Sequence, residues 1–338
     1  MQALVGNVLG KFAVKSSGTT PPKMVFCNYL NISICPATEQ SNSFAVTVYN
    51  PVGRTVISFV EIPVKSSYIV VFGPTGVPVK SQVFTLSRET KRLRDKNSSS
   101  KYKVVFEVKA PPLGFATYFV NFTKQNRREG AFKSHKSIVH ETSDLKDSEE
   151  DIVIKNEFVR LQFSKKTGRL VSMTDMISKL TTTVDQQFLW YAASDGNGIS
   201  SQASGAYIFR PNSSEPYVGS PGNKAEIKIF VGPLVQEVRQ VFSAFASQVV
   251  RLYSGQRHAE FEYTIGPIPV NDNRGKEIIT RFDTDIKSES LFYTDANGRE
   301  MQKRKRNYRP TWKLEVTEPV SGNYYPINSR VYIKDSES

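Results

Sequence analysis

The chain has 338 residues and a formal net charge of +13, and 39% of its residues are hydrophobic and 11% aromatic. This length allows two domains and a sizeable core, and no stretch approaches the ~20 consecutive apolar residues of a membrane-spanning helix. The 21 Phe, 15 Tyr, 18 Pro and 20 Gly favour many strands and turns over long helices, so the composition predicts an all-β protein.

The first 123 residues divide into two parts. Apolar side chains recur at helical spacing over residues 1–14, which predicts a short amphipathic helix; with the linker that follows, it makes a helical stub over residues 1–23. Short β-forming runs separated by turn residues then predict a small antiparallel β-sandwich over residues 24–123. The expected strands include residues 44–49, 56–62, 68–72, 102–108 and 116–120.

The second half of the chain begins after a polar stretch. Residues 124–150 have mixed charge and few anchoring aromatics, which predicts a linker or long exposed loop at a domain boundary. Strand-like runs resume at Ile152 and continue to the end, so residues 151–338 are expected to form a large antiparallel β-sandwich.

Two basic clusters stand out in the sequence. One contains Arg88, Lys91, Arg92, Arg94 and Lys96, and the other is residues 303–306, K-R-K-R. Neither lies in a recognisable nucleic-acid fold or on a basic helix, so a solvated loop or strand face is favoured and no nucleic-acid partner is predicted. A nuclear role for residues 303–306 is the least favoured hypothesis, and it needs reduced Cys27 and Cys35. From spacing alone, these two cysteines allow either one bridge or two buried thiols.

Histidine and carboxylate patterns offer little catalytic chemistry. The three histidines are His135, His140 and His258, and none begins the H-x-D triplet of a zinc site. His258, Glu260 and Glu262 alternate along an expected strand, which allows a metal site or a carboxylate pair. The polar face of a half-buried strand is the favoured interpretation. Nucleophile-elbow, P-loop and dinucleotide-binding motifs are also absent from the sequence.

The segment S-Q-A-S-G-A-Y-I-F-R-P-N at residues 201–212 combines small residues with aromatics. Gly205 leaves its backbone open to approach, while Tyr207 starts a short β-forming run that a turn closes. One interpretation is a core tyrosine on a sandwich strand. The other is a ligand contact, because a tyrosine offers a flat ring for a sugar face and a hydroxyl for a sugar hydroxyl.

This segment resembles the S-G-A-Y segment of the α-mannosidases of glycoside hydrolase family 38, and most of all the lysosomal members. Six further blocks resemble the same family in the same order: C-N-Y-L-N-I-S-I-C-P at residues 27–36, P-L-V-Q-E-V at 233–238, Q-V-V-R-L-Y at 248–253, G-P-I-P-V at 266–270, F-Y-T-D-A-N-G-R-E at 292–300 and Y-R-P-T-W-K-L at 308–314. The resemblance runs from about residue 25 to the end, with a gap near residues 85–150.

The resemblance implies an enzyme that hydrolyses terminal α-D-mannosyl residues of N-linked oligosaccharides in the lysosome. Its members are retaining and zinc-dependent, and their zinc ligands, nucleophile and acid lie upstream of the region that matches this chain. It therefore implies no catalytic residue and no metal ligand here, an inactive isolated chain, and a catalytic domain of the same protein as a partner. The large sandwich is expected to be galactose-mutarotase-like and incomplete at its C-terminus.

The resemblance also assigns roles to individual residues. It implies that Tyr207 contributes to the mannose site and that Cys27 and Cys35 form a disulfide, which indicates an oxidising compartment. Asn31, between these cysteines, matches a family glycosylation site. The sequons at Asn97, Asn121 and Asn212 remain open, because several such triplets are expected by chance.

Two features keep an alternative function open. The N-terminus M-Q-A-L-V-G has no signal-peptide character, so either the protein is cytosolic or the chain lacks its natural beginning; the resemblance favours the second. The alternative is a stand-alone β-sandwich that binds carbohydrate without metal. Its expected sugar platform consists of Trp190, Tyr191, Tyr207, Tyr217 and Trp312.

Overall fold

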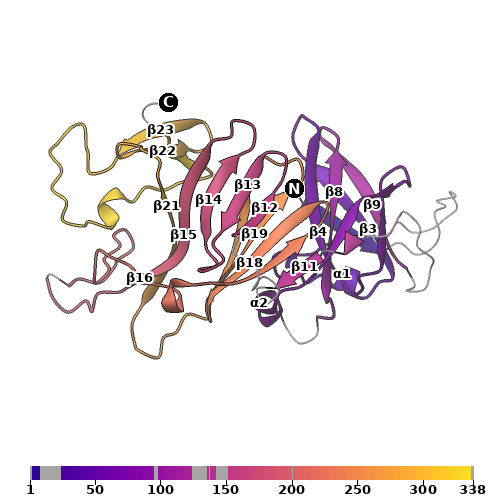
Figure 1. Cartoon of the computed structure of the whole chain (residues 1–338), viewed down its shortest axis with the longest axis horizontal. Helices are drawn as coiled ribbons and strands as arrows, with labels where there is room; N and C mark the ends of the chain where they lie inside the picture. The colour runs from indigo at the N-terminus through magenta and orange to yellow at the C-terminus, as the bar shows by residue number, and fades with distance from the viewer. Residues whose placement is uncertain are drawn as a thin grey trace. The chain divides into compact units, whose positions relative to one another are not determined.

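The computed structural model describes residues 2–7, 24–94, 98–123, 135–136, 138–141, 151–199 and 201–335 (Figure 1). Strands dominate these residues, and the helices among them are short, which confirms the all-β prediction. None of the helices in these ranges is long and apolar enough to cross a membrane. The chain divides into two compact units: residues 1–145, 228–238 and 250–260 form unit 1, and residues 146–227, 239–249 and 261–338 form unit 2.

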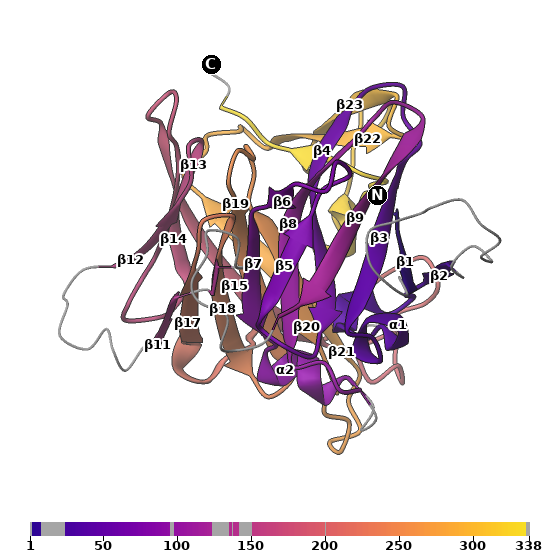
Figure 2. The ribbon, with the colours of Figure 1, turned by 90° about the vertical axis from the view of Figure 1, so that its right-hand side faces the viewer.

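The first sheet of unit 1 has the order β2-β1-β3-β9-β5-β6. Figure 2 shows β3, β9 and β5 side by side, as their antiparallel pairing requires. The strands are β2 (Met24–Phe26), β1 (Gln2–Asn7), β3 (Ser43–Asn50), β9 (Gly114–Phe122), β5 (Ile69–Phe72) and β6 (Pro78–Val79).

The N-terminal helix predicted for residues 1–14 is wrong where the structure describes it. Residues 2–7 are strand β1, which pairs antiparallel with β3 from Gln2 opposite Tyr49 to Asn7 opposite Phe44. A helix of this length is marginal in isolation, whereas the edge of β3 offers a row of unpaired backbone groups that a strand satisfies. Residues 8–14, the rest of the predicted helix, lie outside the described residues.

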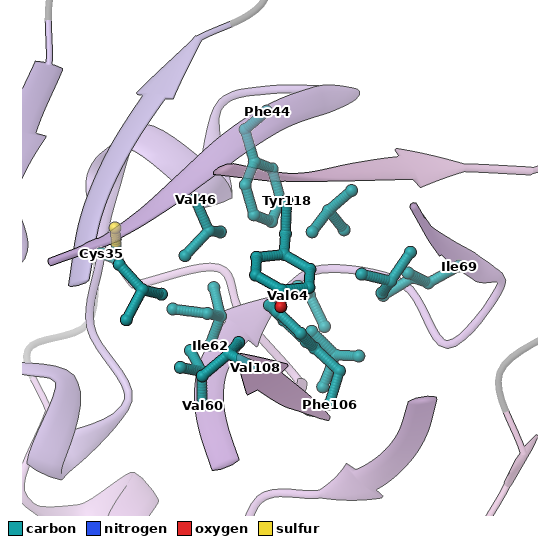
Figure 3. Close-up of a cluster of buried hydrophobic side chains, with 14 of the residues drawn as sticks. Cys35, Phe44, Val46, Val60, Ile62, Val64, Ile69, Phe106, Val108 and Tyr118 are labelled. Carbon is teal, nitrogen blue, oxygen red and sulfur yellow. The ribbon is translucent and has the colours of Figure 1, made fainter. Parts of the chain in front are cut away.

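The second sheet of unit 1 has the order β10-β7-β8-β4 and encloses a hydrophobic core together with the first. One face of each sheet packs inward against this core, and β8 is buried on both faces over residues 103–106, because Val105 packs in a second apolar cluster and Lys103 in a buried ion pair. Figure 3 shows Phe44, Val46 and Tyr118 facing Ile62, Phe106 and Val108 within this core. The strands are β10 (His135–Lys136), β7 (Ser81–Thr85), β8 (Tyr102–Ala110) and β4 (Val56–Val64).

The short helix α1 and a disulfide border this core, and a second short helix, α2, lies between β7 and β8 in the sequence. Cys27 and Cys35 form a disulfide with their Cα atoms 5.1 Å apart. Cys35 is fully buried and caps α1 (Pro36–Glu39), whose Glu39 side chain accepts a hydrogen bond from the Cys35 backbone N–H. The other helix, α2 (Arg88–Arg92), begins at Ser87, whose hydroxyl accepts from the Thr90 N–H at 2.9 Å.

A buried group of charges, the Glu61–Glu237 charge cluster, joins four strands of unit 1. It consists of Glu61 on β4, Lys103 on β8, Glu237 on β18 (Val235–Ser243), and Arg251 and Tyr253 on β19 (Ala246–Tyr253). The Glu237 carboxylate is fully buried and accepts from Lys103 Nζ and Arg251 Nε, both at 2.7 Å. Lys103 Nζ also lies 2.9 Å from Glu61, which accepts from the Tyr253 hydroxyl at 2.8 Å.

Residues 228–238 and 250–260 belong to unit 1, although the sequence prediction assigned them to the second domain. Besides the charge cluster, the buried Gln82 side chain holds this segment: its Oε1 accepts from the backbone N–H groups of Leu234 and Val235, and its Nε2 donates to the Val235 carbonyl at 2.9 Å. A Cβ at Gly232 would lie 2.2 Å from this amide, so glycine is required for the approach. The predicted boundary within residues 124–150 lies mostly outside the described residues and stays a prediction.

The strands of unit 2 form the sheet β12-β13-β14-β15-β16, in which β21 also pairs with β15. A second sheet has the order β11-β17-β18-β19-β20, and the division into units passes through β18 and β19. The remaining bounds are β12 (Ile152–Lys155), β13 (Val159–Phe163), β14 (Leu170–Asp175), β15 (Thr181–Ala192), β16 (Tyr217–Val218), β21 (Lys276–Thr284), β11 (Ile138–Glu141), β17 (Glu226–Val231) and β20 (Glu260–Ile265).

Unit 2 has its own apolar core and a buried chain of amides. Phe188 and Phe242 meet edge to face with ring centroids 5.0 Å apart. Gln186 and Gln248 exchange hydrogen bonds, and Gln248 Nε2 donates to Gln240 Oε1 at 2.7 Å. The last sheet has the order β23-β22-β24, with β22 (Leu291–Ala296), β23 (Glu300–Lys305) and β24 (Val331–Tyr332).

Candidate functional site

The segment singled out in the sequence forms a loop that leaves and rejoins the end of β15. The Ala192 carbonyl accepts from the Asn212 N–H at 2.9 Å, and Ala193 forms a β-bridge with Pro211. The two ends of the intervening chain therefore lie together, as in a compact Ω-loop. We call residues 194–210 the Tyr207 loop.

The tip of the Tyr207 loop is a tight turn closed by two hydrogen bonds. The Gly205 N–H donates to the Ile208 carbonyl at 3.0 Å, so Ala206 and Tyr207 occupy the tip. Behind this turn, the Ser204 hydroxyl accepts from the Arg210 N–H at 2.8 Å. Side-chain oxygens that bond to nearby backbone groups favour such turns over continuous strands.

Tyr207 is 96% exposed, so the interpretation as a core tyrosine is wrong. The predicted strand over residues 207–209 is also wrong, because these residues have no ladder partner and form a bend and irregular chain instead. The β-forming character of Tyr207, Ile208 and Phe209 did not decide the local structure. The Ile208 carbonyl accepts from the Gly205 N–H within the turn, so it is not paired with a neighbouring strand.

Residues on the far side of the tip hold the loop in place. The Phe209 ring contacts the Tyr191 ring edge to face, with centroids 5.5 Å apart. Arg210 Nε donates to Glu318 Oε1 at 2.6 Å, and both side chains are half-buried. An exposed aromatic ring just before two such anchors loses little conformational freedom when it binds a ligand.

Gly205 leaves the backbone open beside the tyrosine. A Cβ at this position would meet no atom within 4 Å, so no contact within the described chain requires the glycine. The open backbone is available to a group from outside.

The other aromatics of the predicted sugar platform do not form one group. Trp190 and Tyr217 stack with centroids 4.6 Å apart, and Lys276 Nζ lies 5.6 Å from the Trp190 ring. Tyr191 instead supports the Tyr207 loop, and burial followed by the nearby Glu215 charge raises the pKa of its hydroxyl. Trp312 is 57% exposed. The five aromatics are therefore not one continuous stacked platform.

The His258, Glu260 and Glu262 group has weak geometry for a metal. Strand β20 begins at Glu260, so His258 precedes the strand, and its Nε2 lies 3.8 Å from Glu260 Oε1 with both side chains well exposed. Across the described part of the chain, no group of three or more His, Cys, Asp or Glu side chains could hold a metal ion. His135 and His140 lie on β10 and β11, and their side chains are outside the described set.

The sequons differ in accessibility. Asn31 lies exposed in a 3-10 turn and Asn212 lies exposed after the Tyr207 loop, whereas Asn121 is half-buried on β9. Asn97 lies outside the described residues, and glycosylation at Asn31, Asn121 and Asn212 stays a prediction.

Glu318 is the site residue that sequence reasoning missed. It lies 108 residues beyond Arg210, and no spacing or motif connects the two. Ser204, in contrast, lies within the segment singled out from the sequence. Serine favours turns because its hydroxyl can bond to nearby backbone groups, so this local contact had a signal in the sequence.

Comparison with known proteins shows that the Tyr207 loop lies within a region that matches a known protein family. Residues 154–338 match the glycosyl hydrolases family 38 C-terminal domain, which is more than half of the chain. The chain belongs to glycosyl hydrolase family 38. Residues 79–120 match the lysosomal alpha-mannosidase-like central domain. The resemblance stated from the sequence is thereby confirmed.

Curated family members are similar over nearly the whole chain. Lysosomal alpha-mannosidase of Bos taurus is 47% identical over 310 residues, which are 92% of this chain and 28% of that protein. The Felis catus protein of the same name is 44% identical, covering 99% of this chain and 31% of its own length. Alpha-mannosidase of Canavalia ensiformis is 37% identical over the full chain, with 35% of its length covered. The chain thus spans about a third or less of these relatives.

Proposed function

We propose that this chain is the β-domain portion of an α-mannosidase that hydrolyses terminal α-D-mannosyl residues of N-linked oligosaccharides. The family match and the names of the relatives support this activity for the whole enzyme. We further propose that the protein acts in the lysosome after passing through the secretory pathway. The Cys27–Cys35 disulfide supports this route, because such bonds form in oxidising compartments.

Within that enzyme, the chain supports the mannose site and contributes Tyr207 to it. The observation that carries this proposal is a fully exposed tyrosine at the tip of a loop that Phe209 and Arg210 anchor just after the tip. Its ring fits the apolar face of a pyranose, its hydroxyl can bond a sugar hydroxyl, and the open backbone at Gly205 admits the sugar.

The bond-breaking chemistry belongs to other parts of the whole enzyme. A retaining glycosidase needs two carboxyl groups about 5–5.5 Å apart, and a zinc ion, when bound, holds sugar hydroxyls and polarises them. The described residues do not offer a ligand set that fits zinc, so no step is assigned to it here. The catalytic domain of the same protein is the proposed partner.

The test is turnover of a chromogenic α-mannoside by the purified chain at acidic pH, with and without added zinc. The proposal expects no turnover under either condition. Zinc-dependent turnover would overturn it, and His258, Glu260 and Glu262 would then be replaced first, one at a time, by glutamine.

A second candidate is a carbohydrate-binding protein that acts without a catalytic partner. The stacked Trp190–Tyr217 pair favours it, because Tyr217 is 41% exposed and stacked aromatics commonly carry sugars. Tryptophan fluorescence during titration with a mannose oligosaccharide distinguishes the two candidates. Saturable quenching that Tyr217→Ala abolishes and Tyr207→Ala leaves intact supports the second candidate; the reverse pattern supports the first.

A further inference from the structure

The basic tetrapeptide at residues 303–306 has no role in the proposed function, yet its placement is specific. It lies on β23, beside β22 in the three-stranded sheet near the C-terminus (Figure 1). Because side chains alternate along a strand, Lys303 and Lys305 project from one face of the sheet and Arg304 from the other. Arg304 is engaged on its own face, where its guanidinium lies 5.0 Å from the Tyr325 ring centroid.

Two tyrosines share the face with the lysines. Tyr293 lies directly opposite Lys303 in the β22–β23 pair and directly opposite Tyr332 in the β22–β24 pair. Directly opposite residues of antiparallel strands project from the same face. The Tyr293 and Tyr332 rings stack, with centroids 4.5 Å apart and planes 9° from parallel. We call Tyr293, Lys303, Lys305 and Tyr332 the lysine–tyrosine face.

The charges of this face are available to an external anion. Among the described residues, no carboxylate forms an ion pair with Lys303 or Lys305, and both lysines are exposed. Lys305 Nζ lies 5.8 Å from the Tyr308 ring, a contact that leaves its charge unneutralised.

Asp295, which projects from the same face of β22, is committed elsewhere. Its buried carboxylate accepts the backbone N–H groups of Gly298, Asn328, Ser329 and Arg330. The hydrogen bonds from Arg330 and Ser329 hold the pKa of Asp295 well below its usual range, so the carboxylate stays ionised in this role. Residues 299–313 contain seven Lys or Arg and one Glu, which makes the segment strongly basic.

We propose that the lysine–tyrosine face binds a sulfated polysaccharide. Lys303 and Lys305 are two residues apart on a strand, so their Cα atoms are about 7 Å apart. Two cations in a row along a strand can contact successive anionic groups of an extended polymer. Tyr332 lies on the edge strand β24, and the face of its ring that does not stack on Tyr293 offers a flat apolar surface for a sugar ring; Tyr332 is 41% exposed.

The disulfide decides between two kinds of polyanion. Basic strands with aromatic rings also suit single-stranded nucleic acid. The Cys27–Cys35 bond, however, indicates an oxidising compartment, where sulfated polysaccharides are the common linear polyanions and nucleic acid is scarce. The polysaccharide is therefore the occupant we assign.

The experiment uses the purified chain and a heparin oligosaccharide in calorimetric titrations at several salt concentrations. The test variant is Lys303→Gln/Lys305→Gln. Its matched control, Lys101→Gln/Lys109→Gln, removes the same charge from exposed positions of unit 1. We expect about tenfold weaker binding for the test variant and a salt dependence reduced by about two counterions, against less than about twofold for the control. Equal losses in the two variants, or no loss in the test variant, would overturn the proposal.

Two further arms identify the ligand class. Tyr332→Leu keeps an apolar side chain but removes the ring, and we expect a loss of about threefold that persists at high salt, where charge contacts are screened. An unchanged affinity would refute the stacking contribution. Single-stranded DNA of equal charge is the competitor: DNA binding as tight as heparin binding would contradict the polysaccharide assignment and indicate a nucleic-acid surface.

Discussion

Replacement of Lys103 by methionine tests the Glu61–Glu237 charge cluster. Methionine keeps most of the aliphatic length, but it removes the cation that lies 2.7 Å from Glu237 and 2.9 Å from Glu61. At an effective dielectric constant of about 20, one such pair attracts by roughly 6 kcal/mol, and the desolvation of both ions offsets much of this. Because Glu237 is fully buried, we expect the variant to lose about 3–5 kcal/mol of unfolding free energy.

The assay must report on unit 1. Trp190 and Trp312 both lie in unit 2, so their fluorescence does not follow the cluster directly. Guanidinium denaturation followed by far-UV circular dichroism gives the free energy, and hydrogen exchange of the β8 amides locates the loss. Arg88→Met is the control, since the Arg88 side chain is 72% exposed in its pair with Glu89 and is worth less than about 1 kcal/mol.

A double-mutant cycle separates the ion pair from other effects of the methionine. Lys103→Met with Glu237→Gln removes both charges, and we expect it to cost at least about 1 kcal/mol less than the sum of the single variants. A loss below about 1 kcal/mol for Lys103→Met, or strict additivity in the cycle, would refute the reasoning that these buried charges depend on each other.

Three further predictions concern stability. Gly168→Ala should lower the free energy of unfolding by roughly 2–4 kcal/mol, because the φ of Gly168 is +67° and a Cβ would lie 2.1 Å from the Ala225 carbonyl oxygen. Gly222→Ala is the control: its φ is also positive, but the space around it is open, so it should cost about 1 kcal/mol. Thermal unfolding measures both, and equal costs would contradict the steric argument. Cys27→Ala/Cys35→Ala should lose about 2.5 kcal/mol for a bridge spanning eight residues, and an unchanged denaturation midpoint would refute it. Burial opposes ionisation of Glu61, but the Arg251 and Lys103 charges lower its pKa below 4.5, so its stabilisation is complete above 4.5 and lost as the pH falls through the folded pKa. Midpoints at decreasing pH check this, and a Glu61→Gln variant with the same acid dependence as the parent would contradict it.

The fold class could be predicted from local sequence patterns, namely short β-forming runs separated by turn residues. Alternation over residues 44–49 predicts a strand with one buried face, and β3 buries Phe44, Val46 and Val48. The β-forming run at residues 102–108 also predicts a strand, and β8 covers it, with both faces buried over residues 103–106. The prediction for the N-terminal segment was wrong. Its apolar spacing suits a helix, but residues 2–7 form a strand because they pair with β3. Pairing partners far along the chain are not visible in local periodicity.

The site was predictable as a segment but not as a geometry. The small residues and turn residues around Tyr207 indicated an unusual loop, yet they did not distinguish a buried ring from an exposed one. The anchor from Arg210 to Glu318 depends on the tertiary fold, as does the convergence of Glu61 and Glu237 from strands 176 residues apart. Charged groups that meet only after folding carry no spacing signal.

The central claim is that this chain completes a mannose site through Tyr207, and a chimera tests it most directly. The chain would replace the matching 28% of the Bos taurus relative, and hydrolysis of a chromogenic α-mannoside would be measured for the parent chimera, Tyr207→Phe and Tyr207→Ala. We predict an active chimera whose kcat/KM falls about tenfold or more with alanine and less with phenylalanine, which keeps the ring but loses the hydroxyl. An active chimera whose kcat/KM is unchanged by Tyr207→Ala would contradict the account.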